Sequence, residues 1–186
     1  MSAEPPSIPD GYPLAARLLH WVIALCVLSL IPAGLLMNQL PSGEPQNALY
    51  TAHRSLGVLV MVLSVIRLGY RLTAKWPEQE SSLTPWQRRA STVVHNLFYG
   101  LLIVQPLVGW YATSAYGARI SVFGLFDLPA LTAKNAAAAD LWFNVHDVLG
   151  FTLAGLVVIH VAAALYHHLI RRDDVLIRML VGQKSS

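Results

Sequence analysis

Four long apolar stretches dominate this sequence and constrain its fold more than any other feature. They cover approximately residues 14–37, 56–72, 91–113 and 145–170. A helix of roughly 20 residues crosses a hydrocarbon core about 30 Å thick, so each stretch is long enough to span a membrane. Charged residues make up 12% of the chain, compared with about 25% in soluble domains. The sequence therefore predicts an all-α integral membrane protein whose four helices form one bundle.

The cations are distributed unevenly over the predicted connections. Most lie between the second and third stretches or after the fourth: Arg71, Lys75, Arg88, Arg89, Arg171, Arg172, Arg178 and Lys184. Such loops stay on the cytoplasmic side, so both termini are expected in the cytoplasm. The connections 38–55 and 114–144 then face outward. Topology accounts for the formal charge of +3, and nucleic acid is not an expected partner.

The stretches divide the chain into three parts. Residues 1–13 form a Pro-rich cytoplasmic lead, residues 14–172 the four-helix membrane domain, and residues 173–186 a cytoplasmic tail. The N-terminus lacks the basic region and cleavage site of a secretory signal, so the first apolar stretch is expected to remain as a helix. Cys26 is the single cysteine, which excludes a disulfide framework, iron–sulfur ligation and covalent attachment of a c-type haem.

Local signals predict several helix boundaries. The first helix is expected to begin near Pro13, and the second to run from Ser55 to Leu72. Thr84 followed by Pro85 is typical of a capped helix start. Pro106 is expected to kink that third helix, because proline removes a backbone hydrogen bond.

The connection 114–144 is not a polar loop. Its segment Ile120–Pro129 is too apolar to extend freely into water. We expect this segment to lie on the outer membrane surface or over the mouth of the bundle. It would act there as a lid over an outer pocket or as an interfacial spacer.

Four histidines in or beside the apolar stretches each have a glycine or alanine four residues later. The pairs are His20 with Ala24, His53 with Gly57, His146 with Gly150 and His160 with Ala164. Position i+4 lies one turn along the same helix face. A small residue there leaves the imidazole exposed beside a flat space, as an axial haem ligand needs, because the macrocycle must lie against the helix. The pattern predicts a membrane cytochrome b.

Spacing sorts these histidines into two pairs. His146 and His160 are 14 residues apart, about 21 Å along a helix and within about 40° of four full turns, so they share a face. His53 lies at the outer depth of His146, and His20 at the inner depth of His160. We therefore expect two non-covalent b haems with axial pairs His53/His146 and His20/His160. Zinc is disfavoured, because its four donors must converge on one point.

Other ionisable residues are candidates for contacts with the same cofactors. Arg67 follows His53 by 14 residues and faces the inner depth, where it would pair with a haem propionate or reach toward the interface. Arg17 and Arg54 are candidates for similar contacts at the two surfaces. The remaining candidates are His95 and His167, which would contact a propionate or a quinone. They are also reserve ligands, the next candidates to bind iron if the inner pairing is wrong.

Several motifs together resemble one known family. They are His20-Trp21, His53-Arg-Ser-Leu-Gly57 followed by Val65-Ile-Arg67, the interval from His146 to His160, and Ala162-Ala-Ala-Leu-Tyr-His-His168. The chain resembles the bacterial cytochrome b561 family, which is related to the cytochrome b subunit of nickel–iron hydrogenases. The resemblance implies four inner-membrane helices and two b haems. It also implies the same ligand pairs as the spacing.

Three functions are compatible with this reading. The leading hypothesis is electron exchange between a membrane quinone, expected to be ubiquinone, and a periplasmic-side donor or acceptor in a respiratory chain. One alternative is an enzyme, a superoxide:ubiquinone oxidoreductase, for which Arg54, Arg119 and Lys134 would form a basic outer entrance. The other is a non-catalytic haem-bearing membrane subunit that transfers electrons to or from a partner oxidoreductase and copurifies with it.

Overall fold

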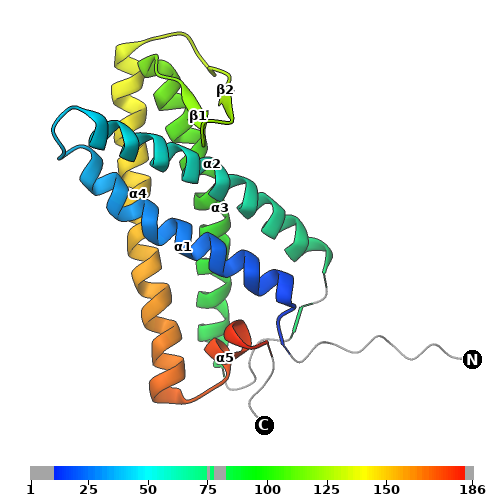
Figure 1. The fold of residues 1–186 in the computed structure, drawn as a ribbon. Coiled ribbons are helices and arrows are strands. Elements are labelled where there is room, and N and C mark those ends of the chain that lie inside the picture. Colours follow the sequence, from blue (N-terminus) through cyan, green and yellow to red (C-terminus); the bar gives the residue numbers. More distant parts are fainter. Residues whose placement is uncertain (1–10, 75, 78–82, 183–186) are drawn as a thin grey trace, which may run out of the picture.

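The computed structural model describes residues 11–74, 76–77 and 83–182, and four long helices make up most of this part (Figure 1). They are α1 (Leu14–Met37), α2 (Glu44–Thr73), α3 (Pro85–Tyr116) and α4 (Ala136–Tyr166). The strands β1 (Ile120–Val122) and β2 (Phe126–Leu128) form an antiparallel hairpin, and a π-helical segment η1 (His167–Arg171) and a short helix α5 (Val175–Leu180) end this part of the chain. All four long helices are long and apolar enough to cross a membrane. The predicted membrane helical bundle is confirmed, whereas Lys75, Lys184 and most of the N-terminal lead lie outside the described residues.

Capping side chains set the starts of α3 and α4. The Thr84 hydroxyl accepts a hydrogen bond from the Gln87 backbone N–H at 3.3 Å, and Gln87 Oε1 accepts one from the Thr84 N–H at 2.9 Å. Pro85 occupies the first helical position, where no N–H is needed. At α4, Asn135 Oδ1 accepts from the Ala138 N–H at 3.0 Å. The predicted start at Thr84-Pro85 is confirmed.

The second helix begins earlier than its hydropathy indicated. A start at Ser55 was wrong, because α2 begins at Glu44. Proline in the first turn of α2 and the carboxylate of Glu44 both favour a helix start. Apolar runs mark only the lipid-spanning part of a helix, and this polar first part was therefore missed. His53 consequently lies in the third turn of α2.

The hairpin packs against the side of α2. Ile120 and Val122 are buried. The Ser55 hydroxyl, on α2, accepts a hydrogen bond from the Phe123 N–H at 3.0 Å and donates one to the Ser121 carbonyl at 3.2 Å. Ser55 is only 1% exposed. The apolar segment is thus attached to the bundle by packing and by two hydrogen bonds to one helix.

The buried core lies between the helices, midway along them. Ile23 and Val27 of α1, Val60 of α2 and Leu153 of α4 form one cluster, and side chains of α3 pack against it. Most large apolar side chains instead face outward. Their exposed surface would be unusual in water but suits contact with lipid. The outward-facing apolar surface therefore agrees with four membrane spans.

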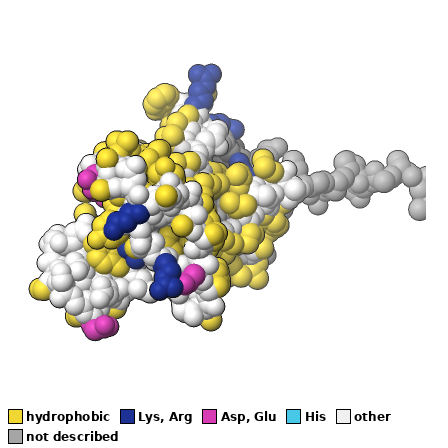
Figure 2. Space-filling view, turned by 90° about the horizontal axis from the view of Figure 1, so that it is seen from above, with side chains coloured by type: hydrophobic (Ala, Val, Ile, Leu, Met, Phe, Trp, Pro, Cys, Tyr) yellow, Lys and Arg dark blue, Asp and Glu magenta, His cyan; other side chains and the backbone are white. Residues whose placement is uncertain are grey.

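The two ends of the bundle differ. The turn between α1 and α2 and the hairpin lie at one end, here called the hairpin end, and α5 lies at the other, the terminal end (Figure 1). Seen from the hairpin end, the coloured surface is largely apolar or uncharged with scattered charged side chains, and no histidine is visible among them (Figure 2). The histidines nearest this end are therefore covered by other side chains in this view.

Candidate functional site

Two pairs of histidines meet inside the bundle. His53 of α2 and His146 of α4 form the hairpin-end pair, with ring centroids 6.2 Å apart and ring planes inclined by 73°. His20 of α1 and His160 of α4 form the terminal-end pair, 6.1 Å apart and inclined by 62°. One member of each pair lies on α4, about 21 Å from the other along the helix. The structure thus brings together the residues that the spacing paired.

Helix α3 contacts both the ring and the backbone of His146. His146 Nδ1 lies 3.1 Å from the Gln105 carbonyl oxygen, to which its N–H donates. In return, Gln105 Nε2 donates to the His146 carbonyl at 2.8 Å. Gly109 approaches so closely that a Cβ there would lie 2.9 Å from His146 Cε1. With Nδ1 as donor, Nε2 carries the free lone pair of the neutral ring.

His53 packs against α1 in a similar way. A Cβ at Gly34 would lie 3.3 Å from His53 Cε1. His53 Nδ1 is buried without a hydrogen-bond partner among the described residues, although the Leu30 backbone is close to the ring. The two rings of the hairpin-end pair are therefore held differently, His146 by a hydrogen bond and packing and His53 by packing.

A cavity opens beside the hairpin-end pair. It is partly open to the outside, and apolar side chains make up most of its lining. His53, His146, Gly57 and Gly150 all line it. A Cβ at Gly57 would meet no atom within 4 Å, whereas one at Gly150 would lie 3.2 Å from Gln105 Nε2. Gly57 thus leaves free space beside His53, and Gly150 makes room for Gln105.

A third histidine lies beside the terminal-end pair. The His95 ring, on α3, has its centroid 5.6 Å from that of His160, and the Phe98 ring lies 5.3 Å away. His95 Nδ1 is 2.6 Å from the Ser91 carbonyl oxygen, to which it donates. The other ring nitrogen is therefore the one with a free lone pair. His20, His95 and His160 come from three different helices.

Arg67 of α2 reaches the same region. One of its terminal nitrogens donates to the Ala16 carbonyl of α1, and Tyr99 of α3 also lies close to it. Arg67 is near enough to His20 to interact with it electrostatically. The arginine predicted at the inner depth therefore lies beside the terminal-end pair.

Arg54 lies at the other pair. Its guanidinium carbon is 5.2 Å from the centre of the Tyr50 ring, one turn earlier on α2. It is also close enough to His53 to interact electrostatically. Each pair thus has one arginine near it, both carried by α2.

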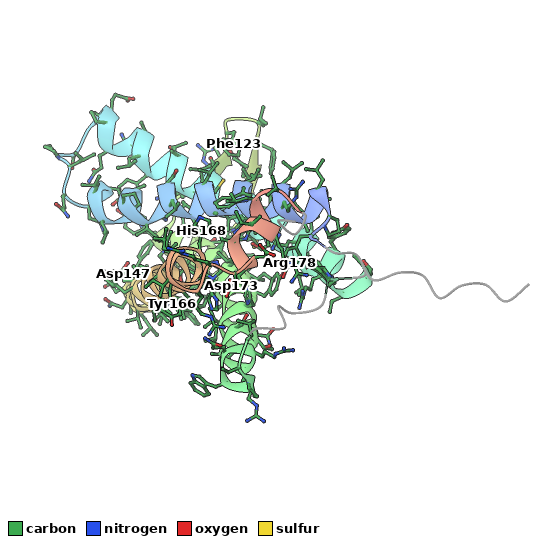
Figure 3. All side chains as sticks on the ribbon, turned by 90° about the horizontal axis from the view of Figure 1, so that it is seen from below. Phe123, Asp147, Tyr166, His168, Asp173 and Arg178 are labelled. Carbon is green, nitrogen blue, oxygen red and sulfur yellow. The ribbon has the colours of Figure 1, made fainter. Side chains whose placement is uncertain are left out.

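The segment after α4 folds back under α1. Trp21 Nε1 donates to the Met179 carbonyl at 3.2 Å, and Arg17 donates to the Leu180 carbonyl at 3.0 Å. Figure 3 shows α5, which carries Arg178, crossing the terminal end below α1. The predicted tail after residue 172 therefore contains a docked helix. Arg17, predicted to contact a cofactor, is engaged with that helix in this structure.

His167 lies apart from both pairs. Its Nδ1 is 2.6 Å from Asp173 Oδ2, and Arg171 Nε is 3.6 Å from the same oxygen. The His167 and Asp173 side chains are only 12% and 9% exposed. The structure therefore places this reserve ligand in a charged cluster at the terminal end, where Figure 3 shows Asp173 near α5.

The geometry of the pairs fits one iron ion between two imidazoles. A first-row metal binds an imidazole nitrogen at about 2.0–2.1 Å, and the ring centre lies about 1 Å beyond, so two opposed rings have centroids about 6 Å apart. The observed 6.1 and 6.2 Å agree with this spacing. The free Nε2 of His146 and the open space at Gly57 also suit a haem held without covalent bonds.

Three residues that contact the hairpin-end pair were missed from the sequence: Gly34, Gly109 and Gln105. The search for small residues at i+4 examines only the helix that carries the histidine. Glycines within apolar stretches do signal close helix contacts, and Gly34 and Gly109 are such glycines. Which histidine faces each one depends on how the helices are aligned, and that alignment is a property of the packed bundle.

The chain is similar to known proteins along nearly its whole length. A model of the prokaryotic cytochrome b561 family matches residues 11–182. Cytochrome b561 homolog 2 of Escherichia coli K12 is 35% identical over 179 residues, which cover 96% of this chain and 95% of that protein. Cytochrome b561 homolog 1 of the same organism is 29% identical over 171 residues, covering 89% and 94%. A Yersinia pestis protein named probable superoxide oxidase CybB is 26% identical over 167 residues, covering 90% and 94%.

Proposed function

Because the chain belongs to the prokaryotic cytochrome b561 family of membrane electron-transfer proteins, which bind haem b, we propose that it carries two b haems, one at each histidine pair. His53 and His146 would hold one iron, and His20 and His160 the other. The observation that carries the proposal is the distance between rings, 6.2 and 6.1 Å, in two pairs contributed by facing helices.

A bound haem supplies a one-electron carrier, whose potential depends on its axial ligands, its burial and nearby charge. The chain contributes each of these influences. The cavity wall beside His53 and His146 is mostly apolar. Arg67 near the terminal-end pair and Arg54 near the hairpin-end pair are the candidates to offset propionate charge.

We infer that electrons pass between a membrane quinone, ubiquinone, and a donor or acceptor on the periplasmic side. The excess of Lys and Arg at the terminal end supports a cytoplasmic position for both termini. The hairpin-end pair is then the periplasmic one. His95, beside the terminal-end pair, and His167, paired with Asp173, are the candidate quinone contacts or reserve ligands.

A second candidate is superoxide oxidation with ubiquinone as the acceptor. The likeness to the Yersinia pestis protein supports it. Of the three cations predicted to attract the anion, Arg119 is 88% exposed, but one of its terminal nitrogens lies 3.8 Å from Asp127 Oδ2. Lys134 lies over Gly117. Haem reduction by superoxide with a steep salt dependence would support this function, whereas reduction by quinol alone would count against it.

Haem content tests the proposal directly. The protein purified in mild detergent should contain two haems per chain with the sharp bands of low-spin b haem in its reduced-minus-oxidised spectrum. His53→Ala and His160→Ala should each keep one haem, and the control His168→Ala should keep two. A wild-type protein with one haem, or ligand variants that keep both, would contradict the pairing.

A further inference from the structure

We infer that α3, which carries neither ligand of the hairpin-end pair, positions His146 through Gly109 and Gln105. The inference rests on the proposed function, since it assumes that His146 binds iron. It assigns to these two residues a role in setting the orientation of the ring and the electronic character of the ligand. They would be positioning residues that act through His146.

Gly109 provides a flat surface for the imidazole ring. A Cβ on Gly109 would lie 2.9 Å from Cε1, 3.1 Å from Nδ1 and 3.7 Å from Nε2 of His146. The ring therefore lies against the backbone of α3 along one edge. The colliding atoms belong to a side chain with two rotatable bonds, so an alanine would displace the ring and leave the helix intact. An added methyl group at Gly109 would therefore change the orientation of the His146 ring directly.

Gln105 fixes the ring from the same helix. Its carbonyl accepts the Nδ1–H of His146 at 3.1 Å, which determines the tautomer and directs Nε2 to the iron position. Its side chain donates to the His146 carbonyl at 2.8 Å, and Gly150 leaves room for the amide. The two bonds join the same two residues in opposite directions. They align α3 with α4 at the ligand.

The ring of His53, the other histidine of the hairpin-end pair, is held less firmly by its neighbours. His53 Nδ1 is buried without a hydrogen-bond partner among the residues described, and a Cβ on Gly34 would remain 3.3 Å from its Cε1. A neighbour can move by a few tenths of an ångström to accommodate that contact. His146 is thus the oriented ligand of the pair, and His53 the one that can adjust.

Replacing each of three glycines by alanine tests the inference, because the three added Cβ atoms would lie at different distances from the nearest histidine ring. Gly109→Ala should shift the electron paramagnetic resonance signal of the oxidised hairpin-end haem, which depends on the orientation of the imidazole planes, together with its midpoint potential. Gly34→Ala should produce a smaller shift. Gly100→Ala, on the same helix as Gly109 and with no atom within 4 Å of its added Cβ, should match the wild type. The terminal-end haem serves as an internal measure of folding and should be unchanged in all three.

A second variant keeps the test valid if Gly109→Ala does not fold. Gln105→Leu removes the side-chain bond to the His146 carbonyl at similar volume, while the Gln105 backbone carbonyl that accepts the His146 Nδ1–H remains. The hairpin-end haem should then be lost faster to a haem acceptor protein. If His146→Ala keeps both haems, the proposed function fails. If His146→Ala loses one haem but Gly109→Ala and Gln105→Leu both behave as Gly100→Ala and the wild type, the positioning role alone is overturned.

Discussion

Arg67 shows how a single ionisable side chain is accommodated inside an apolar bundle. Its guanidinium donates to the Ala16 carbonyl, which begins the turn of α1 that ends at His20. Arg67 therefore touches the turn that carries a proposed ligand and remains close to that ligand. A buried arginine needs a partner, and here a backbone carbonyl supplies one contact. Tyr99 of α3 also lies close to the guanidinium, and in the proposed function this group offsets the charge of a propionate.

The first prediction concerns the charge of Arg67. Arg67→Gln should lower the midpoint potential of the terminal-end haem, because a reduced haem carries one more negative charge and loses a nearby cation. The expected shift is on the order of 60 mV, which corresponds to a tenfold change in a one-electron equilibrium. Redox titration followed by optical spectroscopy measures it. The control Arg119→Gln, at the hairpin end, should leave this potential unchanged; equal potentials in both variants would refute the role of Arg67.

At the scale of elements, packing and the hydrogen bonds of one buried side chain join the hairpin to α2. Ser55 is buried and bonds two backbone groups of the hairpin. Without its hydroxyl, the Phe123 N–H and the Ser121 carbonyl would be left without that partner. The hairpin is therefore expected to respond to changes in α2 close to His53.

Ser55→Ala should loosen the hairpin. Leaving buried polar groups unpaired typically reduces stability by about 1–3 kcal/mol. Hydrogen exchange should increase in residues 120–128 and little elsewhere. Thr152→Ala is the matched control, because the Thr152 hydroxyl bonds only to the Val148 carbonyl of its own helix. Equal exchange in the two variants would show that Ser55 does not hold the hairpin.

The short helix α5 depends on α1 in a comparable way. Arg17→Ala removes the hydrogen bond to the Leu180 carbonyl, which lies at the end of α5, where cations favourably meet free carbonyls. We expect faster proteolytic cleavage after residue 172 in detergent solution, with haem content retained. Arg54→Ala should not change the cleavage rate. An unchanged rate in Arg17→Ala would mean that Trp21 and packing suffice to dock α5.

Features that depend on residues near each other in the sequence were predictable, whereas features that depend on the packing of two helices were not. Thr84 and Pro85 mark the start of α3 by themselves, and the 14-residue interval placed His146 and His160 on one face. The first part of α2 has no apolar pattern, so its helix was missed. The glycines opposite the histidines were missed because their role arises only when two helices pack.

At the scale of the whole molecule, the bundle leaves a space beside the hairpin-end pair that protein atoms do not fill. The hairpin-end pair lines a partly open cavity, and a Cβ added at Gly57, which also lines it, would meet no described atom within 4 Å. A ligand that binds the folded state alone stabilises it, by about 2.7 kcal/mol at a hundredfold excess over its dissociation constant. Cofactor loading and folding should therefore be coupled.

Removal of haem should lower the unfolding temperature. We expect apo-protein in detergent to unfold at a lower temperature than the loaded protein, and added haem to restore the difference. In the double variant His53→Ala/His146→Ala the restoration should be about half as large, because one site remains. Thermal scans followed by circular dichroism measure this. Equal unfolding temperatures with and without haem would contradict the coupling.

The 14-residue interval on α4 has a further consequence for energy conversion. An elementary charge that crosses the whole membrane exchanges about 2.3 kcal/mol with the field for every 100 mV of potential. The two iron positions proposed here are separated by about 21 Å of a core about 30 Å thick. An electron moving between them would cross roughly two-thirds of that voltage, or about 1.6 kcal/mol per 100 mV. The direction of net electron flow would then depend on how strongly the cell has energised its membrane as well as on the two redox partners.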